Sequence, residues 1–347
     1  MKHHLFTLLT VFTLYGIIPC AVAQDIHFSQ FSETPLLRNP SLAGIFSGDL
    51  RIQGVTRSQW GSVTVPFQTT SLNGEYKLPI GLNDDFITFA GQVLYDKAGT
   101  VALKTLQLLP AVNYHKSLSA NRNMYLSLGF MGGLVQRRLD RSKVTTDHQY
   151  DGTTGGANNG DDGEAFSGNG YSYFDGSVGM SFNAEVGENP DNNMYLGVAY
   201  HHFNKASRIS FYGNEEVAML PKWVVSGGLR MGVNDYTYVT FYADYASQGP
   251  SSEVLAGALY SYKLDNDVDN PMYTITGGAY LRWQDAIIPV AKLEYKPFTV
   301  AVSYDINTSK LTTASNGRGG FEISLVYQKS FNRYMRSAGN ATRCPRF

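Results

Sequence analysis

Three acidic residues in this sequence have a spacing that could do chemistry. Asp265, Asp267 and Asp269 alternate like the first ligands of a calcium loop, and carboxylate oxygens are the ligands that Ca²⁺ prefers. The glycine that should follow them is replaced by Asn270, and the closing glutamate by Thr276. We therefore interpret this stretch as a polar turn between two strands and predict no metal site there.

A histidine pair is the second candidate for chemistry. His201 and His202 lie shortly before Ser207 and Ser210, and a hydrolase uses such a histidine to activate a serine. Adjacent side chains of a strand point to opposite faces, however, and no nucleophile motif accompanies the pair. The stretch GGLRMG does not follow the strand–loop–helix pattern of a phosphate-binding loop. The sequence therefore predicts neither an enzyme nor a cofactor.

A long glycine-rich stretch also carries several ionisable side chains that could hold an ion. They are Asp147, His148, Asp151, Asp161, Asp162 and Glu164. Glycine, polar residues and charge without apolar periodicity are typical of a flexible loop. We favour an external loop over an ion site.

The first residues have the pattern of a secretory signal peptide. A short polar start precedes the apolar run 5–18, which is too short to span a bilayer, and Ala21-Val22-Ala23 has the small-x-small form of a cleavage site. Cleavage after Ala23 leaves Cys344 as the single cysteine, which excludes an intramolecular disulfide. The mature chain is nearly neutral, which argues against a nucleic-acid partner.

The composition of the chain is unusual for a soluble protein. Charged residues make up only 16%, against about a quarter in typical soluble proteins. The chain has 23 Tyr and 35 Gly, yet no second apolar run is long enough for a membrane helix. A membrane β-barrel hides its apolar side chains in alternating positions. The composition therefore favours an all-β outer-membrane barrel in contact with the lipid bilayer.

Alternating segments of about ten residues support a barrel. Fourteen candidates start near Asp49, Phe67, Phe86, Leu103, Asn123, Tyr171, Met194, Lys222, Tyr236, Ser252, Met272, Ala286, Phe298 and Gly319. One face of each is apolar and the other carries Gly, Ser, Thr and charges. The alternation predicts that Leu126, Val302 and Leu325 face lipid and that Glu185 and Glu322 face the lumen. We expect Arg230 to face the lumen as well.

The connections between these segments alternate in length. Those after odd-numbered segments include all the long ones, and those after even-numbered segments are mostly short and rich in turn-forming residues. An outer-membrane barrel requires this alternation, with both termini in the periplasm. The regions 58–66 and 205–220 are ambiguous, so twelve or sixteen strands remain alternatives to an antiparallel barrel of about fourteen.

Aromatic and charged residues of the segments give two further expectations. Aromatic residues cluster near segment ends, as interfacial girdles require: Tyr200, Phe203, Tyr242, Tyr245, Tyr260, Tyr262, Trp283, Tyr295, Phe298, Tyr327 and Phe331. Charges on the lumen face are Arg51, Arg57, Glu75, Lys77, Glu185, Arg230, Asp244, Arg282, Lys292 and Glu294. These charges either pair across the wall or hold a plug or ligand, and the sequence leaves both alternatives open.

The stretch QDIHFSQFSETPLLRNPSLAG, residues 24–44, is apolar but fits neither a helix nor a strand. Phe28, Phe31, Leu36 and Leu37 need a place to bury, and the barrel is too wide to be filled by its own side chains. We expect the segment to pack within or across the periplasmic mouth. The alternative is a disordered leader that orders only on binding a partner.

The same stretch carries a family resemblance. The residues are Asp25, Phe28-Ser29-Gln30-Phe31, Pro35-Leu36, Asn39-Pro40 and Ala43-Gly44. Arg57-Ser58-Gln59-Trp60 and the tail Cys344-Pro345-Arg346-Phe347 match as well. The chain resembles the PorP/SprF family of outer-membrane proteins of Bacteroidota, with modest departures at Ile26-His27 and Ser41.

The resemblance implies a part in the type IX secretion system. The expected role is a substrate-specific partner for secretion or surface attachment of a large protein with a type B C-terminal domain, such as a gliding adhesin, together with other periplasmic and outer-membrane secretion components. A passive channel for small or hydrophobic solutes is the alternative. The domain boundaries expected are a signal peptide over 1–23, an N-terminal segment over 24–48, a barrel over 49–331 and a periplasmic tail over 332–347.

Resemblance and pattern together select the candidate residues for plugging or partner binding. They are Phe28, Ser29, Gln30, Phe31, Pro35, Asn39, Pro40, Gly44, Arg57, Gln59, Trp60, Cys344, Pro345 and Phe347.

Overall fold

The computed structural model describes most of residues 25–331. The gaps are 62–64, 81–83, 120–121, 152–155, 158–162, 165, 190, 208, 213–216, 269, 310–311 and 316. The predicted signal peptide and C-terminal tail, with Cys344, Pro345 and Phe347, lie outside the described residues. Among the described residues no helix is long and apolar enough to cross a membrane.

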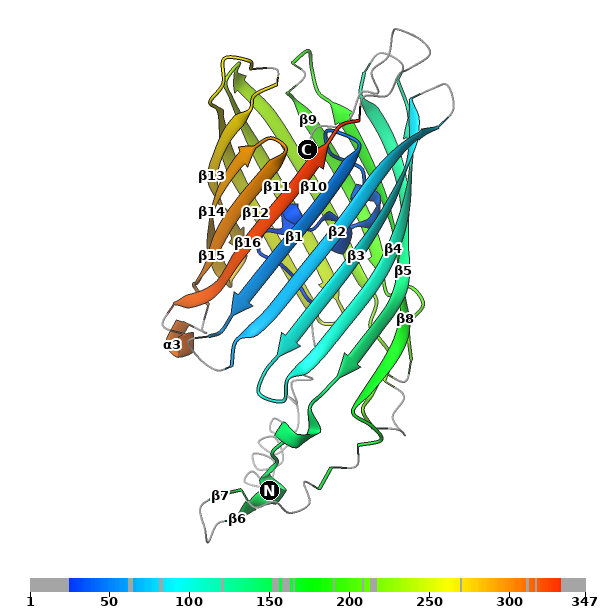
Figure 1. Cartoon of the computed structure of the whole chain (residues 1–347), viewed down its shortest axis with the longest axis vertical. Helices are drawn as coiled ribbons and strands as arrows, with labels where there is room; N and C mark the ends of the chain where they lie inside the picture. The colour runs from blue at the N-terminus through cyan, green and yellow to red at the C-terminus, as the bar shows by residue number, and fades with distance from the viewer. Residues whose placement is uncertain are drawn as a thin grey trace, which may run out of the picture.

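Fourteen antiparallel strands form one closed barrel (Figure 1). They are β1 (Leu50–Gln59), β2 (Phe67–Ile80), β3 (Asp85–Ala98), β4 (Leu103–Ser117), β5 (Met124–Arg138), β8 (Gly170–Glu185), β9 (Asn193–His201), β10 (Lys222–Asn234), β11 (Thr237–Gln248), β12 (Ser251–Lys263), β13 (Tyr273–Arg282), β14 (Ala286–Tyr295), β15 (Phe298–Asn307) and β16 (Arg318–Lys329). β1 pairs with β16 and so closes the ring. The paired residues extend from Leu50 opposite Lys329 to Gln59 opposite Gly320. Closure leaves no free edge, so the strands satisfy one another's backbone groups in lipid. The predicted fold class is confirmed.

The small elements are not part of the barrel wall. The strands β6 (Tyr150–Asp151) and β7 (Gly156–Ala157) form a separate pair beside the short helices η3 (Arg141–Lys143) and η4 (Asp147–Gln149), and α3 (Thr312–Ser315) precedes β16. The N-terminal segment contains η1 (Phe31–Glu33), α2 (Pro35–Arg38) and η2 (Pro40–Leu42). No strand forms among the described residues of 60–66 and 202–221, so neither ambiguous region adds a further strand to the barrel.

The two ends of the barrel differ in their connections. The connections 139–169, 202–221 and 308–317 lie at one end, which we call the long-loop end and which is at the bottom of Figure 1. The connections 81–84, 235–236 and 296–297 lie at the other end, the short-turn end, together with the start of β1 and the end of β16.

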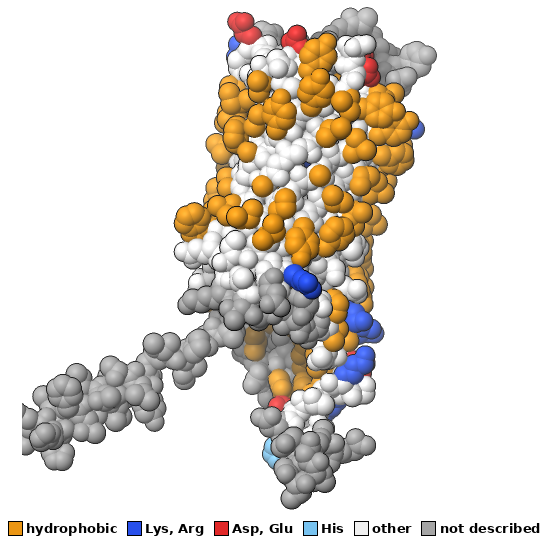
Figure 2. Space-filling view, turned by 90° about the vertical axis from the view of Figure 1, so that its left-hand side faces the viewer, with side chains coloured by type: hydrophobic (Ala, Val, Ile, Leu, Met, Phe, Trp, Pro, Cys, Tyr) orange, Lys and Arg blue, Asp and Glu red, His pale blue; other side chains and the backbone are white. Residues whose placement is uncertain are grey.

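The outer face of the wall is apolar, as expected for lipid contact. Leu126, Val302 and Leu325 are exposed on this face, and Glu322 is fully buried inside. Figure 2 shows hydrophobic side chains over much of the height of one face. Exposed aromatic residues include Trp283 at the long-loop end. Tyr242 was expected in a girdle, and this prediction was wrong, because its ring packs inside the barrel against the N-terminal segment.

Candidate functional site

The N-terminal segment lies inside the barrel, as the dark blue chain in Figure 1 shows. It was expected to close one mouth, but it extends the whole length of the lumen. Asp25 contacts His202, at the end of β9, and Asp49 donates its backbone N–H to the carbonyl of Lys329, at the end of β16. Residue 25 and residue 49 therefore lie at the long-loop end and the short-turn end, respectively.

Asp25 and the residues next to it, which we call the head of the segment, are held by a series of charged side chains. The Nε2 of His202 lies 2.8 Å from the Oδ2 of Asp25, and its Nδ1 lies 2.8 Å from the Oδ1 of Asp175. The Nζ of Lys222 is 3.5 Å from the same oxygen of Asp25. Burial disfavours the imidazolium, but the two carboxylates outweigh it and raise the pKa of His202 to about 9. Burial likewise favours neutral Asp25, but Lys222 and His202 hold its pKa well below the ordinary value.

The histidine pair is thus structural. Opposite orientations were expected for the two rings, and this was wrong, because His202 has left the strand with φ of 59° and turns its ring inward. His201 Nδ1 lies 2.9 Å from the Oγ of Ser177, and its Nε2 lies 3.0 Å from the carbonyl oxygen of Arg38. Both ring nitrogens of His201 therefore have structural partners.

One carboxylate receives the backbone of the F-S-Q-F motif. The N–H groups of Ser29 and Gln30 donate to the two oxygens of Glu322 at 2.6 and 2.7 Å. Arg57 lies 3.2 Å from the same carboxylate and 3.0 Å from Asp305. Because a buried carboxylate needs both charge and hydrogen-bond partners, this network fixes the motif to β15 and β16.

The side chains of the same motif are also satisfied. The Oγ of Ser29 donates to Asp305 at 2.8 Å and accepts from Arg282 at 2.6 Å. The Oγ of Ser324 donates to the amide oxygen of Gln30 at 2.7 Å. Buried polar groups that are fully paired specify one position for the segment.

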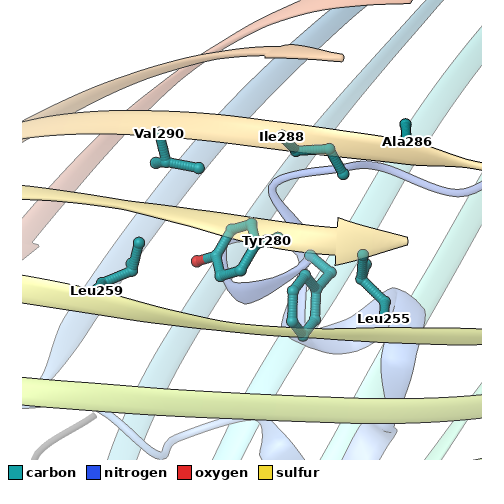
Figure 3. Close-up of a cluster of buried hydrophobic side chains, with 7 residues drawn as sticks. Leu255, Leu259, Tyr280, Ala286, Ile288 and Val290 are labelled. Atoms are coloured by element: carbon teal, nitrogen blue, oxygen red, sulfur yellow. The ribbon is translucent and has the colours of Figure 1, made fainter. Parts of the chain in front are cut away.

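Phe31 fills an apolar pocket in the wall. Its ring packs with Leu255, Leu259, Tyr280, Ala286, Ile288 and Val290, which Figure 3 shows on neighbouring strands. The rings of Phe31 and Tyr280 meet edge to face at 4.8 Å between centroids. On its other side the guanidinium of Arg38 lies 4.8 Å from the Phe31 centroid. Arg38 in turn forms an ion pair with Asp244, so an apolar anchor and a buried ion pair stabilise one another.

The turn at Asn39-Pro40, which we call the N-P turn, packs directly against glycines of the wall. The side chain of Asn39 accepts the Ser41 backbone N–H at 2.9 Å and so closes the turn before η2. A Cβ on Gly179 would lie 1.9 Å from the Oδ1 of Asn39, and one on Gly129 would lie 2.5 Å from the carbonyl carbon of Pro40. Gly129 and Gly179 are direct neighbours on β5 and β8. Only residues without a side chain allow this approach.

The end of the segment is fixed near the short-turn end. Gly44 has φ of 87°, where glycine is favoured, and its N–H donates to Glu75 at 2.7 Å. Glu75 also pairs with Arg51 at 2.7 Å. The Nζ of Lys77 donates to the carbonyl oxygen of Phe46. The lumen charges therefore do both things that the sequence left open: they pair across the wall and they hold the segment.

The candidate residues do not all meet. Nine of them are buried in the lumen: Phe28, Ser29, Gln30, Phe31, Pro35, Asn39, Pro40, Gly44 and Arg57. Gln59 is the last residue of β1, at the long-loop end, and Trp60 follows it. The Trp60 ring packs on the Phe67 ring, with centroids 4.8 Å apart, and not on the segment. While the segment stays in place, its buried residues are not a surface for a partner.

A cavity of about 80 Å³ remains between the segment and the strands β10 to β12. Its apolar lining comes mainly from Phe28, Phe31, Leu37, Val224 and Leu255. Asp25, Lys222 and Glu253 are among its polar lining residues. No group of His, Cys, Asp and Glu suited to a metal occurs among the residues that the structure describes.

Several residues that hold the segment were not selected from the sequence. Asp25 belongs to the family motif, but its partners His202 and Lys222 lie far away in the sequence, and so does Asp175, the second partner of His202. Glycines on the lumen face of adjacent strands, such as Gly129 and Gly179, were a usable signal. They mark positions where another backbone approaches closely.

Several solved structures of barrel proteins are similar to this chain. The toluene transporter TbuX of Ralstonia pickettii matches with a TM-score of 0.51 and 12% identity, over 86% of this chain and 94% of that one. A monoaromatic hydrocarbon channel TodX variant gives 0.49 and 14%, over 85% and 94%, and a Pseudomonas aeruginosa FadL homologue gives 0.46 and 10%, over 85% and 94%. At 12% identity the likeness to TbuX shows the fold alone. No curated protein gives a match.

The family comparison covers nearly the whole barrel together with the segment inside it. The model of the type IX secretion system membrane protein PorP/SprF matches residues 21–327. This is a family of secretion-system membrane proteins and not an enzyme family. The match includes both the closed fourteen-stranded wall and the motif-bearing segment in its lumen. The chain therefore belongs to the PorP/SprF family of type IX secretion system membrane proteins.

Proposed function

We propose that the protein is a substrate-specific partner in type IX secretion that does not itself form the translocation pore. Its substrate would be a large secreted or surface-displayed protein with a type B C-terminal domain, such as a gliding adhesin. The observation that carries this proposal is the occupied lumen. A passing polypeptide would have to displace the anchor Phe31 and break the buried pairs of Arg57 and Glu75.

We infer the orientation from the connections. Outer-membrane barrels have short periplasmic turns and longer external loops. The short-turn end would then face the periplasm, where the tail after Lys329 can meet other secretion components. The long-loop end would face the exterior, with Asp25 at the external mouth. The expected periplasmic position of the mature N-terminus is not part of this proposal, because the segment crosses the lumen.

Two long connections offer a firm surface for the substrate at the long-loop end. The ring of Phe166 stacks on that of Tyr212 with centroids 5.0 Å apart, and the guanidinium of Arg141 lies 4.8 Å from the Phe166 centroid. The hydroxyl of Tyr212 donates to Glu164 at 2.7 Å. Such a cluster of aromatic residues and arginine at a loop surface is typical of binding hot spots.

Capture from native membranes tests the proposal. A tagged chain should enrich a type B C-terminal domain protein, and the variant Phe166→Ala/Tyr212→Ala should recover it at least tenfold less. The variant Tyr236→Ala, at an exposed short-turn position, is the matched control and should recover it normally. If all three proteins recover the substrate equally, the aromatic cluster has no role in its capture. If the tagged chain enriches no protein with a type B C-terminal domain, the proposal is contradicted.

The cavity beside the segment favours a second candidate function. Its apolar lining suits a small hydrophobic solute, so a passive channel for such solutes remains an alternative. Uptake of a labelled monoaromatic compound into vesicles separates the two functions. Faster uptake than in protein-free vesicles would favour the channel.

A further inference from the structure

Three cations lie side by side on the outer wall at the long-loop end. Lys97 of β3 is directly opposite Lys104 of β4, and Lys104 is directly opposite Arg138 of β5. Lys97 shares its face with the exposed Tyr95, Lys104 with the exposed Leu108, and Arg138 with the exposed Leu134. All three side chains therefore point away from the lumen.

This group, which we call the cation row, has no counter-ion among the residues that the structure describes. The nearby Asp96 faces the lumen and accepts from Thr69 at 2.6 Å. Directly opposed residues of antiparallel strands have Cβ atoms about 5 Å apart, and like charges in such pairs are destabilising. Three unpaired cations in register are therefore unfavourable unless an anion lies between them.

The cation row lies at the depth of a lipid headgroup. The next outward row toward the barrel centre is Tyr95, Leu106 and Gln136, and the row after it is Val93, Leu108 and Leu134. On β4, Lys104 and Lys116 face outward and are 116 − 104 = 12 residues apart. At about 3.3 Å per residue and a tilt of about 40°, they are separated by roughly 30 Å along the membrane normal. An apolar band of about 25 Å fits between them.

The opposite interface is different. There, Lys116 pairs with Asp85 at 2.8 Å, and the hydroxyl of Tyr114 donates to the same carboxylate. Among the described residues of β3, β4 and β5, the outward cations at the long-loop interface have no carboxylate partner, whereas Lys116 at the short-turn interface has one.

We infer that the cation row binds the phosphate groups of a phosphorylated glycolipid in the leaflet at the long-loop end. A phosphate accepts several charge-assisted hydrogen bonds, and an arginine beside two lysines can surround it. The acyl chains of the lipid would lie along the apolar rows beneath. The leaflet assignment rests on the proposed orientation, whereas the phosphate chemistry rests on the cation row alone.

Binding of defined lipids to the purified full chain in detergent tests the inference. The probes are lipid A with two phosphates and dephosphorylated lipid A. The variant Lys97→Gln/Lys104→Gln/Arg138→Gln should bind the bisphosphorylated lipid at least tenfold more weakly than the parent. The control Lys116→Gln/Arg122→Gln/Lys329→Gln, which loses three cations at the short-turn end, should bind within twofold of the parent. Dephosphorylated lipid should bind all three equally weakly.

Heat-modifiable gel mobility shows whether each variant is folded. If the triple variant is not folded, the single variant Lys104→Gln replaces it in the binding assay. Equal affinities of parent and row variant, or equal losses in row and control variants, would overturn the inference. Displacement of the lipid by an equal concentration of inorganic phosphate would also overturn it, because the site would then take a free anion. Substrate capture does not depend on this assay, so the two proposals can fail separately.

Discussion

The contact between the N-terminal segment and the wall depends on single side chains, or on their absence. Gly179 has no room for a Cβ, because the amide oxygen of Asn39 would lie 1.9 Å away. Overpacking of this kind costs about 1–3 kcal/mol. We predict that Gly179→Ala loosens the segment without opening the barrel, seen as at least tenfold faster proteolysis within residues 25–48.

Gly54 provides the matched control for that variant. It lies on β1, and a Cβ there would meet nothing within 4 Å. Gly54→Ala should leave the proteolysis rate unchanged. If Gly179→Ala is as resistant as the parent protein, the close approach of the N-P turn is wrong.

The head of the segment should respond to pH. The pKa of His202 is raised to about 9 from an ordinary value near 6.5, so its stabilising contribution is complete below pH 6.5 and is lost as the pH rises through 9. The pKa of Asp25 is lowered, so its contribution is lost only in strong acid. Cleavage near Ile26 should therefore accelerate between pH 7 and pH 10.

The variant His202→Gln identifies the group responsible. Glutamine cannot become charged, so the variant should be cleaved faster at pH 7 and should lose most of the acceleration toward pH 10. An unchanged pH profile would assign the effect to another group.

At the level of elements, the strands were predictable because their signal is local. The starts at Phe67, Leu103, Lys222, Ala286 and Phe298 coincide with the expected ones, and the other nine differ by one residue. Each strand needs only its own alternation, which is imposed by lipid on one side and a polar lumen on the other.

The path of the segment was not predictable in the same way. Phe28 and Phe31 indicated burial, but several partners of this segment lie more than 200 residues away, as Glu322 and Asp305 do. Tyr242 shows how a local criterion fails. Its place in an aromatic-rich strand suggested a girdle, but its ring packs inside the barrel against Phe31 of the segment. Tertiary contacts decide such positions.

Adjacent residues of β16 provide a test of the two faces. Leu325 points to lipid near the middle of the strand, where an arginine costs about 2–4 kcal/mol. Leu325→Arg should therefore lower the yield of folded barrel in lipid vesicles. Ser324 faces the lumen but is bonded to Gln30, so Ser324→Arg should fold and instead expose the segment to protease.

At a lumen-facing position of a barrel strand, an arginine is ordinarily tolerated. The structure changes this expectation because the lumen is filled at this point. Equal folding yields of the two arginine variants would contradict the assigned register, since a shift of one residue exchanges the faces.

For the whole molecule, the segment changes the character of the barrel. A wall of fourteen strands encloses more space than its own side chains fill. Residues 25–48 occupy that space with apolar anchors, buried ion pairs and backbone hydrogen bonds from one end to the other. This filled lumen supports the proposal of a partner protein over that of an open pore.

Ion conductance of single barrels in planar lipid bilayers tests this account most directly. The full chain should show little or no conductance, and a variant lacking residues 25–47 should show large, stable conductance steps, because the lumen would then be filled only by water and wall side chains. A full chain that conducts as much as the shortened variant would contradict the account.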